Sequence, residues 1–159
     1  MTVEIRIDDL SSAATQALIA HHLAGMHASS PAESVHALDL ERLRHPSVTF
    51  FSAWIDGEIA GIGALSQIDG LRGELKSMRV DDRFLGRGVG RAILRHLIAT
   101  ATERGMTSLW LETGTPADFA AATRLYESEG FVACGPFGDY VEDPFSLFMT
   151  KSLADIRPE

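Results

Sequence analysis

The sequence lacks most of the features that would place the protein outside a reducing compartment. It has one cysteine, Cys134, in 159 residues, which excludes an internal disulfide and offers no paired spacing for zinc, so no metal site is expected. No apolar run approaches the roughly 18 residues that a membrane helix needs. The first residues, MTVEIRIDD, contain neither the basic nor the apolar part of a signal peptide. We therefore expect a cytoplasmic protein with no membrane partner.

Internal repeats, low-complexity tracts and linkers rich in proline or serine are also missing. Hydrophobic residues make up 45% of the chain, which is too large a share for a disordered protein. A chain of this length buries roughly 68–70% of its unfolded surface, so it can form one domain with a substantial core. We expect a single domain over residues 1–153 and a C-terminal tail over residues 154–159.

The net charge of −8 argues against binding to nucleic acid or to an anionic membrane. One segment departs from this balance, because residues 72–95 hold seven cationic and three acidic residues and therefore carry a local charge of +4. An acidic chain with one basic segment is expected to use that segment on a small anionic ligand. A solvated helix face is the alternative.

The spacing of apolar residues predicts an α/β fold with a mixed sheet. Asp56-Gly57 joins two β-rich runs and predicts a hairpin with a type I′ turn, in which both residues take positive φ. Antiparallel strands should come first and a parallel strand–helix–strand unit second. Thr115 is expected to cap the last helix, with Pro116 in its first turn. The predicted strands are 3–7, 48–55, 58–65, 74–80, 109–112, 131–133 and 145–150, and the predicted helices are 12–26, 38–43, 88–104 and 116–129.

The segment DDRFLGRGVGRAIL, where a predicted strand meets a predicted helix, is the most informative part of the chain. Gly86, Gly88 and Gly90 alternate there, which allows backbone N–H groups and the helix N-terminus to converge on an anion. Arginines recur every fourth residue from position 87 to position 95 and suit a pyrophosphate with an additional phosphate. A Walker loop is excluded because no Gly-Lys pair is present, and a dinucleotide-binding fingerprint lacks its final glycine.

The same segment resembles motif A of the GNAT acetyltransferases, Arg/Gln-x-x-Gly-x-Gly/Ala, with Leu85 in place of the usual Arg or Gln. Residues 122–131, ATRLYESEGF, resemble a second GNAT motif, A-x-x-L-Y-x-x-x-G-F, although Phe119 replaces the Asn often found three residues earlier. The two motifs have the order and spacing of the family, and the predicted elements cover the whole chain. The sequence is similar to the small stand-alone bacterial members of the family.

This resemblance implies an enzyme that moves the acetyl group of acetyl-CoA directly to an amine in a ternary complex. The pantetheine arm of the coenzyme would lie where the strands 74–80 and 108–113 diverge, and the glycine loop would hold the pyrophosphate. The residues that the resemblance assigns to the coenzyme are Met78, Arg79, Val80, Gly86, Arg87, Gly88, Val89, Gly90 and Arg91.

The resemblance also indicates which residues carry out the chemistry. The family places a tyrosine of the last helix near the coenzyme sulfur as general acid, which here is Tyr126, although a packing role is the alternative. The amine must lose a proton before it attacks, and the candidate bases are Glu74, placed narrowly first, and Glu112. Each lies on a strand that borders the expected cleft. Ion pairing of either glutamate, and proton loss through ordered water, stay open as alternatives.

The acceptor is the part of the reaction about which the sequence says least. A small-molecule amine is expected, and the alternatives are a protein or peptide acceptor and a regulator that binds acyl-CoA without catalysis. His27 and His36 flank a polar segment where GNAT proteins often build the acceptor pocket. They are either acceptor contacts or exposed loop histidines. The sequence leaves open whether the protein is a monomer or a homodimer.

Overall fold

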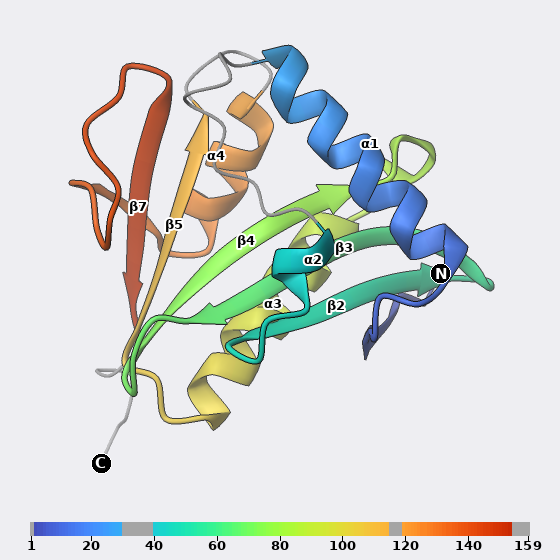
Figure 1. Cartoon of the computed structure of the whole chain (residues 1–159), viewed down its shortest axis with the longest axis horizontal. Coiled ribbons are helices and arrows are strands. Elements are labelled where there is room, and N and C mark those ends of the chain that lie inside the picture. Colours follow the sequence, from blue (N-terminus) through green and yellow to red (C-terminus); the bar gives the residue numbers. More distant parts are fainter. Residues whose placement is uncertain (1, 30–39, 115–118, 154–159) are drawn as a thin grey trace.

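A seven-stranded sheet extends through the part of the chain that the computed structural model describes, residues 2–29, 40–114 and 119–153, with the backbone alone for 27–29. The strand order is β1-β2-β3-β4-β5-β7-β6, and within it only β4 and β5 are parallel neighbours (Figure 1). The predicted mixed sheet is therefore confirmed. The elements are β1 (Glu4–Ile7), α1 (Ala13–Ser29), α2 (Leu40–Leu43), β2 (Val48–Ile55), β3 (Glu58–Gln67), β4 (Arg72–Val80), the 3₁₀ turn η2 (Asp82–Phe84), α3 (Val89–Glu103), β5 (Ser108–Gly114), α4 (Ala120–Ser128), β6 (Val132–Cys134) and β7 (Ser146–Ser152).

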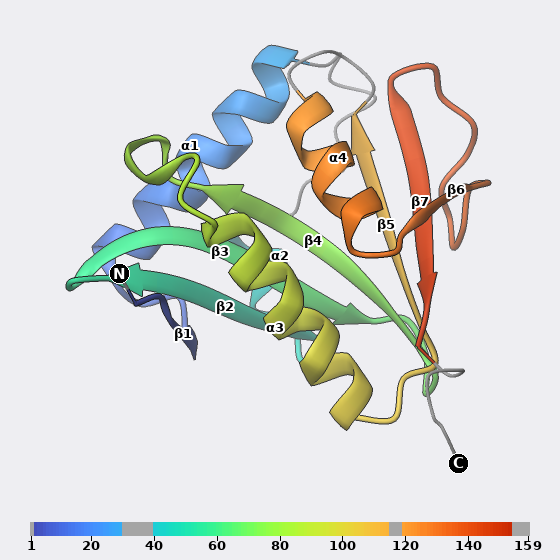
Figure 2. The same cartoon turned by 180° about the vertical axis from the view of Figure 1, so that it is seen from behind.

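Helices cover both faces of the sheet. Two opposite views show α1 and α2 on one face and α3 and α4 on the other (Figure 1 and Figure 2). Leu18 and Ile19 of α1 pack against the sheet with Ile62 of β3, while Ile93 and Leu97 of α3 belong to the core on the opposite face. The central strand β3 is apolar along most of its length because it meets helices on both sides. Within the described residues, no helix is both long and apolar enough to cross a membrane.

Most elements form where the sequence pattern predicts them. β2 has the predicted bounds, and the turn that follows has φ of +48° at Asp56 and +82° at Gly57, which confirms the type I′ hairpin. β3 continues past its predicted end to Gln67 because its polar last residues still pair with β4. The cap predicted at residues 115–116 lies outside the described residues, and α4 begins at Ala120.

Candidate active site

The parallel strands β4 and β5 begin as neighbours and then diverge. Their pairing reaches only to Leu75 opposite Leu111, although β4 continues to Val80 and β5 to Gly114. Within the described ranges, the backbone groups at the end of β4 therefore have no partner strand on the β5 side. Since backbone N–H and C=O groups need hydrogen-bond partners, a bound ligand can take the place of the missing strand.

A β-bulge in β4 accompanies this divergence. The register between β3 and β4 passes from Ala64–Lys76 to Ile62–Arg79, so β4 contains one residue more than β3 in this stretch. Ser77 in the bulge has φ of +57°, a left-handed conformation that costs a non-glycine residue about 1–2 kcal/mol. Bulges bend a strand and increase its twist, which directs the end of β4 away from β5.

The glycine loop, residues 86–90, leads into the first turn of α3 and has the geometry of an anion cradle. Gly86 and Gly88 have φ of +77° and +83°, and a Cβ on either would meet nothing within 4 Å. Gly88 is the N-cap of α3 and has no capping side chain, so the first N–H groups of α3 are available to a ligand. Gly90 serves packing, because a Cβ there would lie 3.3 Å from Leu125 and 3.4 Å from Val80.

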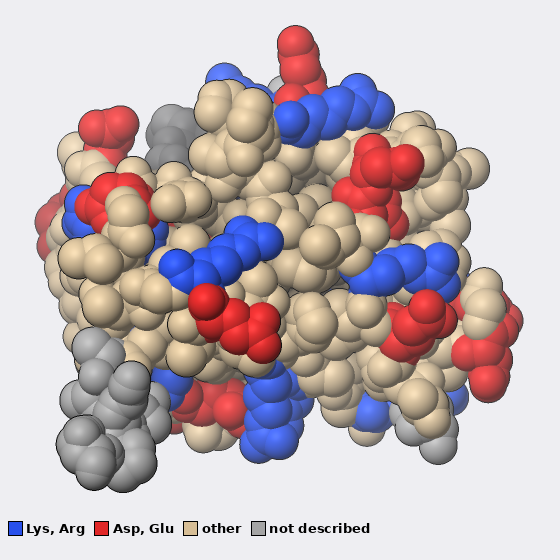
Figure 3. All heavy atoms as spheres, turned by 90° about the horizontal axis from the view of Figure 1, so that it is seen from below, with Lys and Arg blue, Asp and Glu red and all other residues tan. Residues whose placement is uncertain are grey.

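Several arginines of the basic segment, residues 72–95, have partners within the protein. Arg91 forms a short ion pair with Glu129 at the C-terminal end of α4, and Arg95 lies 3.1 Å from the same carboxylate. The guanidinium of Arg87 lies 5.5 Å from the ring centroid of Phe84 and forms no ion pair with a described residue. Two of the three regularly spaced arginines therefore link α3 to α4. On the face drawn in Figure 3, Lys and Arg lie beside Asp and Glu without an extended patch of one sign.

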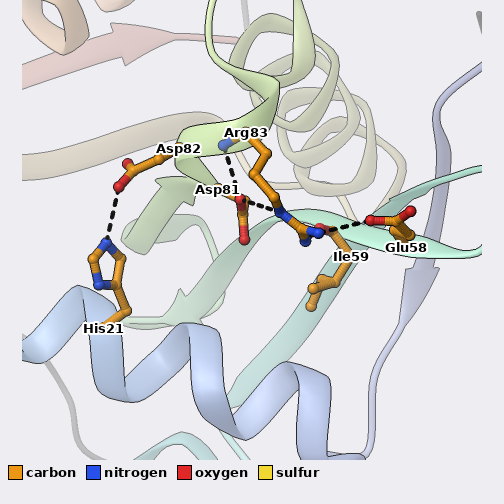
Figure 4. Close-up of polar contacts among 6 residues, drawn as sticks. All are labelled: His21, Glu58, Ile59, Asp81, Asp82 and Arg83. Atoms are coloured by element: carbon orange, nitrogen blue, oxygen red, sulfur yellow. Dashed lines mark hydrogen bonds and ion pairs between the residues drawn. The ribbon is translucent and has the colours of Figure 1, made fainter.

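Arg83, which stands two residues before the position of the missing motif arginine, points toward the β2–β3 hairpin (Figure 4). Its guanidinium donates hydrogen bonds to Asp81 at 3.0 Å and to Glu58 at 2.7 Å. On the same loop, the carboxylate of Asp82 lies 3.4 Å from Nε2 of His21 on α1. These contacts attach the loop to the hairpin and to α1, so Arg83 does not replace the absent arginine.

Two cavities open beside the diverging strands. The larger cavity, of about 510 Å³, is lined by the end of β4 from Met78 to Val80 and reaches Leu85 and Gly90 of the glycine loop. The smaller cavity, of about 90 Å³, is lined by Glu112 of β5. Both cavities touch the same six side chains: His22, Met26, Met78, Phe119, Ala122 and Tyr126. The two cavities therefore meet at these residues.

Tyr126 of α4 lies at the junction of the two cavities and is 6% exposed. Its ring packs edge-on against Phe131, with 5.9 Å between the ring centroids. Burial, and secondarily the charge of Glu112, raise the pKa of Tyr126 to about 12. The hydroxyl is therefore protonated at neutral pH and can act as a hydrogen-bond donor.

Glu112 supplies a titratable carboxyl group to the smaller cavity. Burial raises the pKa of Glu112 to about 7, although a hydrogen bond from Oγ of Ser146 at 2.7 Å and the charge of Lys76 act in the opposite direction. A carboxyl group with this pKa exchanges its proton near neutral pH, which is what a general base requires.

Glu74 has a different environment. Its carboxylate accepts a hydrogen bond from the Tyr140 hydroxyl at 2.5 Å and another from Nζ of Lys76 at 3.2 Å. Lys76 also donates to Tyr140 at 2.8 Å, which closes a largely buried network. Glu74 lines neither cavity. The geometry therefore favours Glu112 over Glu74, the reverse of the order that the sequence suggests.

His22 of α1 is a site residue that the sequence analysis missed. It is 7% exposed, lines both cavities, and its Nδ1 has no hydrogen-bond partner in the part of the chain that the structure describes. Burial, and then the charges of Arg79 and His21, lower the pKa of His22 to about 4, so the ring is neutral at physiological pH. Its spacing is the signal that could have found it, because it lies four residues after Leu18 and four before Met26 on the buried side of α1.

The remaining candidates are placed as follows. The side chain of His27 and the whole of His36 lie outside the described residues. Cys134, the single cysteine of the chain, is not expected to act in the site, and burial raises the pKa of its thiol, which argues against a nucleophilic role. Within the described ranges, no group of three or more His, Cys, Asp or Glu side chains is arranged to hold a metal ion.

Comparisons with known proteins identify the family of this chain. Residues 15–131 match the model of the acetyltransferase (GNAT) family. The chain is 50% identical to the uncharacterized N-acetyltransferase YsnE of Bacillus subtilis, over 95% of this chain and 100% of that protein. It is 41% identical to the IAA acetyltransferase of Azospirillum brasilense, over 77% of this chain and 80% of that protein.

A solved structure shares the fold. It is a GNAT family acetyltransferase from Elizabethkingia anophelis with acetyl-CoA bound, which has a TM-score of 0.70 and 18% identity over 95% of this chain and 98% of that chain. This chain belongs to the GNAT family of acetyltransferases. It is an acetyl-CoA-dependent N-acetyltransferase, and the resemblance identified from the two sequence motifs is confirmed.

Proposed function

We propose that this enzyme transfers the acetyl group directly from acetyl-CoA to the amine of a small molecule while both substrates are bound. The observation that carries the proposal is the junction of the two cavities at Tyr126, with the carboxyl group of Glu112 in the smaller one and the glycine loop beside the larger one. Two substrates in these cavities would meet at Tyr126, so no acyl group needs to pass through a side chain of the enzyme.

The larger cavity has the features that acetyl-CoA requires. Bound there, acetyl-CoA supplies an acetyl group on a good leaving group. The side of the Met78–Val80 backbone that faces away from β3 and is not paired with β5 would bind the pantetheine arm. The N–H groups of residues 86–91, together with the Arg87 guanidinium, would hold the pyrophosphate. Open space beside Gly86 and Gly88 supports this assignment. Val89 is 1% exposed, so it would contribute its backbone alone.

Tyr126 and Glu112 would move the protons. An alkyl amine is mostly protonated at neutral pH and attacks only after it loses a proton, which the carboxylate form of Glu112 would accept. Tyr126 would donate a hydrogen bond to the sulfur as negative charge develops there, because its raised pKa keeps the hydroxyl protonated. Glu74, held by Lys76 and Tyr140, would shape the electrostatics beside Glu112.

The size of the smaller cavity supports a small acceptor. About 90 Å³ accommodates a few heavy atoms, and the similarity to an IAA acetyltransferase points in the same direction. The test is a panel of small amines and of short peptides with free N-termini, incubated with acetyl-CoA while thiol release is measured. We expect turnover with small amines. Turnover with peptides alone would establish the peptide alternative, and tight binding of CoA with no turnover on either panel would establish a non-catalytic regulator.

Gly88→Asp is expected to weaken CoA binding by about 10- to 100-fold, the loss of one charge-assisted hydrogen bond, because it places a carboxylate where the pyrophosphate should bind. Aspartate tolerates positive φ better than most residues and is favoured at a helix N-cap, so the fold should persist. Gly57→Asp is the matched control, since Gly57 has φ of +82° and equally open surroundings at the hairpin turn. Calorimetry of CoA binding should separate the two variants, and equal affinities would contradict the pyrophosphate assignment.

A further inference from the structure

Arg79 of β4 is a cation that no acidic side chain neutralises within the described residues. Other cations of the basic segment are paired, Lys76 with Glu74 and Arg91 with Glu129. Arg79 lines the larger cavity together with His22, and neither an ion pair nor a hydrogen bond joins its guanidinium to the described part of the chain. An unpaired guanidinium in a cavity is a ready site for an anionic group of a ligand.

Gly25 of α1 makes this position of Arg79 possible. Glycine inside a helix costs about 1 kcal/mol relative to alanine, so its presence there needs a reason. A Cβ on Gly25 would lie 2.9 Å from Nη1 and 3.1 Å from Nη2 of Arg79, which shows that the guanidinium rests against the helix backbone. α1 covers one face of the sheet and α3 the other (Figure 1 and Figure 2). The Arg79 guanidinium therefore lies on the face of the sheet opposite to α3, the helix that follows the glycine loop.

Two buried polar atoms beside the cavities also lack hydrogen-bond partners among the described residues. They are Nδ1 of His22, in a residue that is 7% exposed, and Oγ of Ser77, in a residue that is 9% exposed. Both side chains line the smaller cavity, which also holds Glu112. A buried polar group without a hydrogen bond is unfavourable, so a ligand that pairs with these atoms gains affinity.

We propose that the acceptor carries a carboxylate as well as its amine, so that the substrate class is the amino acids and related small zwitterions. This inference rests on the proposed function. The acceptor would extend from the smaller cavity past His22, where the two cavities meet, so that its carboxylate reaches the Arg79 guanidinium at the side of the larger cavity. His22 and Ser77 would add neutral hydrogen bonds, and Glu112 would face the amine. The cationic Arg79 thus pairs with the substrate carboxylate and the acidic Glu112 with the substrate amine. Arg79 determines specificity for acceptors that carry a carboxylate.

The experiment compares each acid with its own amide. The twenty common L-amino acids, β-alanine and γ-aminobutyrate are assayed beside their primary amides, with acetyl-CoA as donor and thiol release as readout. The wild-type enzyme should prefer the acid form of its best acceptor by at least about 10-fold. Arg79→Met should reduce this preference by about 10- to 100-fold, the loss of one charge-assisted pair. Gly25→Ala should reduce it in part, because the new Cβ displaces the guanidinium without changing the charge.

The controls separate failure of this inference from failure of the proposed function. Arg104→Met removes an arginine that bonds Thr49 and lines neither cavity, so the preference should stay unchanged. A preference that survives Arg79→Met, or turnover only of amines without a carboxylate, would overturn the inference and leave the proposed function standing. A tenfold loss of CoA affinity in Arg79→Met would also overturn it, by assigning Arg79 to the coenzyme. No turnover of any amine would overturn the proposed function itself.

Discussion

Replacing Glu112 with glutamine is expected to lower kcat/KM by about 10²–10⁴ at pH 8, the contribution of a positioned general base. The wild-type enzyme should lose kcat/KM as the pH falls through about 7, because Glu112 then takes up a proton and can no longer accept one from the amine. This acidic limb should disappear from the Glu112→Gln profile. The measurement is kcat/KM against pH with a saturating concentration of acetyl-CoA.

Glu74→Gln is the matched control for this prediction. Glu74 lies on the neighbouring strand but lines neither cavity, so the acidic limb should persist in the variant even if the network with Tyr140 is weakened. If Glu74→Gln removes the limb and Glu112→Gln retains it, the order inferred from the geometry is wrong. If both variants retain it, the amine loses its proton through ordered water.

The carboxyl group of Glu112 should also make the free energy of unfolding depend on pH, with the fold stabilised at low pH rather than at high pH. Its pKa is about 7 in the folded protein and about 4.5 in the unfolded chain, so folding favours the protonated form. The resulting stabilisation is complete below pH 4.5 and is lost as the pH rises through 7. Glu112→Gln should therefore be more stable than the wild type at pH 8, by about 2–3 kcal/mol, and should lose this advantage at pH 4. Urea unfolding at the two pH values measures the difference, and an equal advantage at both would exclude the raised pKa.

Tyr126→Phe is expected to lower kcat by about 10²–10⁴, the usual contribution of a general acid. The variant keeps the ring and its contact with Phe131, so the free energy of unfolding should change little. Affinity for CoA should also stay the same, because the hydroxyl would act on the sulfur only as the acetyl group departs. Single-turnover kinetics, which isolate the chemical step from product release, measure the effect.

Tyr140 provides the control, since the chain has two tyrosines. Tyr140 lines neither cavity, and Tyr140→Phe removes a hydroxyl that bonds Glu74 and Lys76, so it should lower stability and leave single-turnover rates within a few-fold of the wild type. If Tyr126→Phe reacts at the wild-type rate in single-turnover experiments, Tyr126 is not the general acid and serves packing alone.

The parts of the fold that depend on local sequence were predictable. Residues 48–55 are rich in β-branched and aromatic residues and form β2 with the predicted bounds, and Asp56-Gly57 takes the positive φ that its composition favours. The alternating glycines of residues 86–90 likewise indicated a loop with left-handed positions before α3. Each of these features is decided by neighbouring residues along the chain, so pattern and turn chemistry suffice.

The sequence by itself determined the elements, the family and the glycine loop, whereas the tertiary structure decided which side chains meet. The left-handed conformation of Ser77 has no local signature, yet it accompanies the divergence of β4 from β5. Burial raises the pKa of Glu112, whereas Glu74 accepts a hydrogen bond from Tyr140, which lies 66 residues further along the chain. The position of the Arg79 guanidinium depends on the α1 backbone, which passes beside it at Gly25. Burial, pairing and close approach are properties of segments far apart in sequence, and only packing sets them.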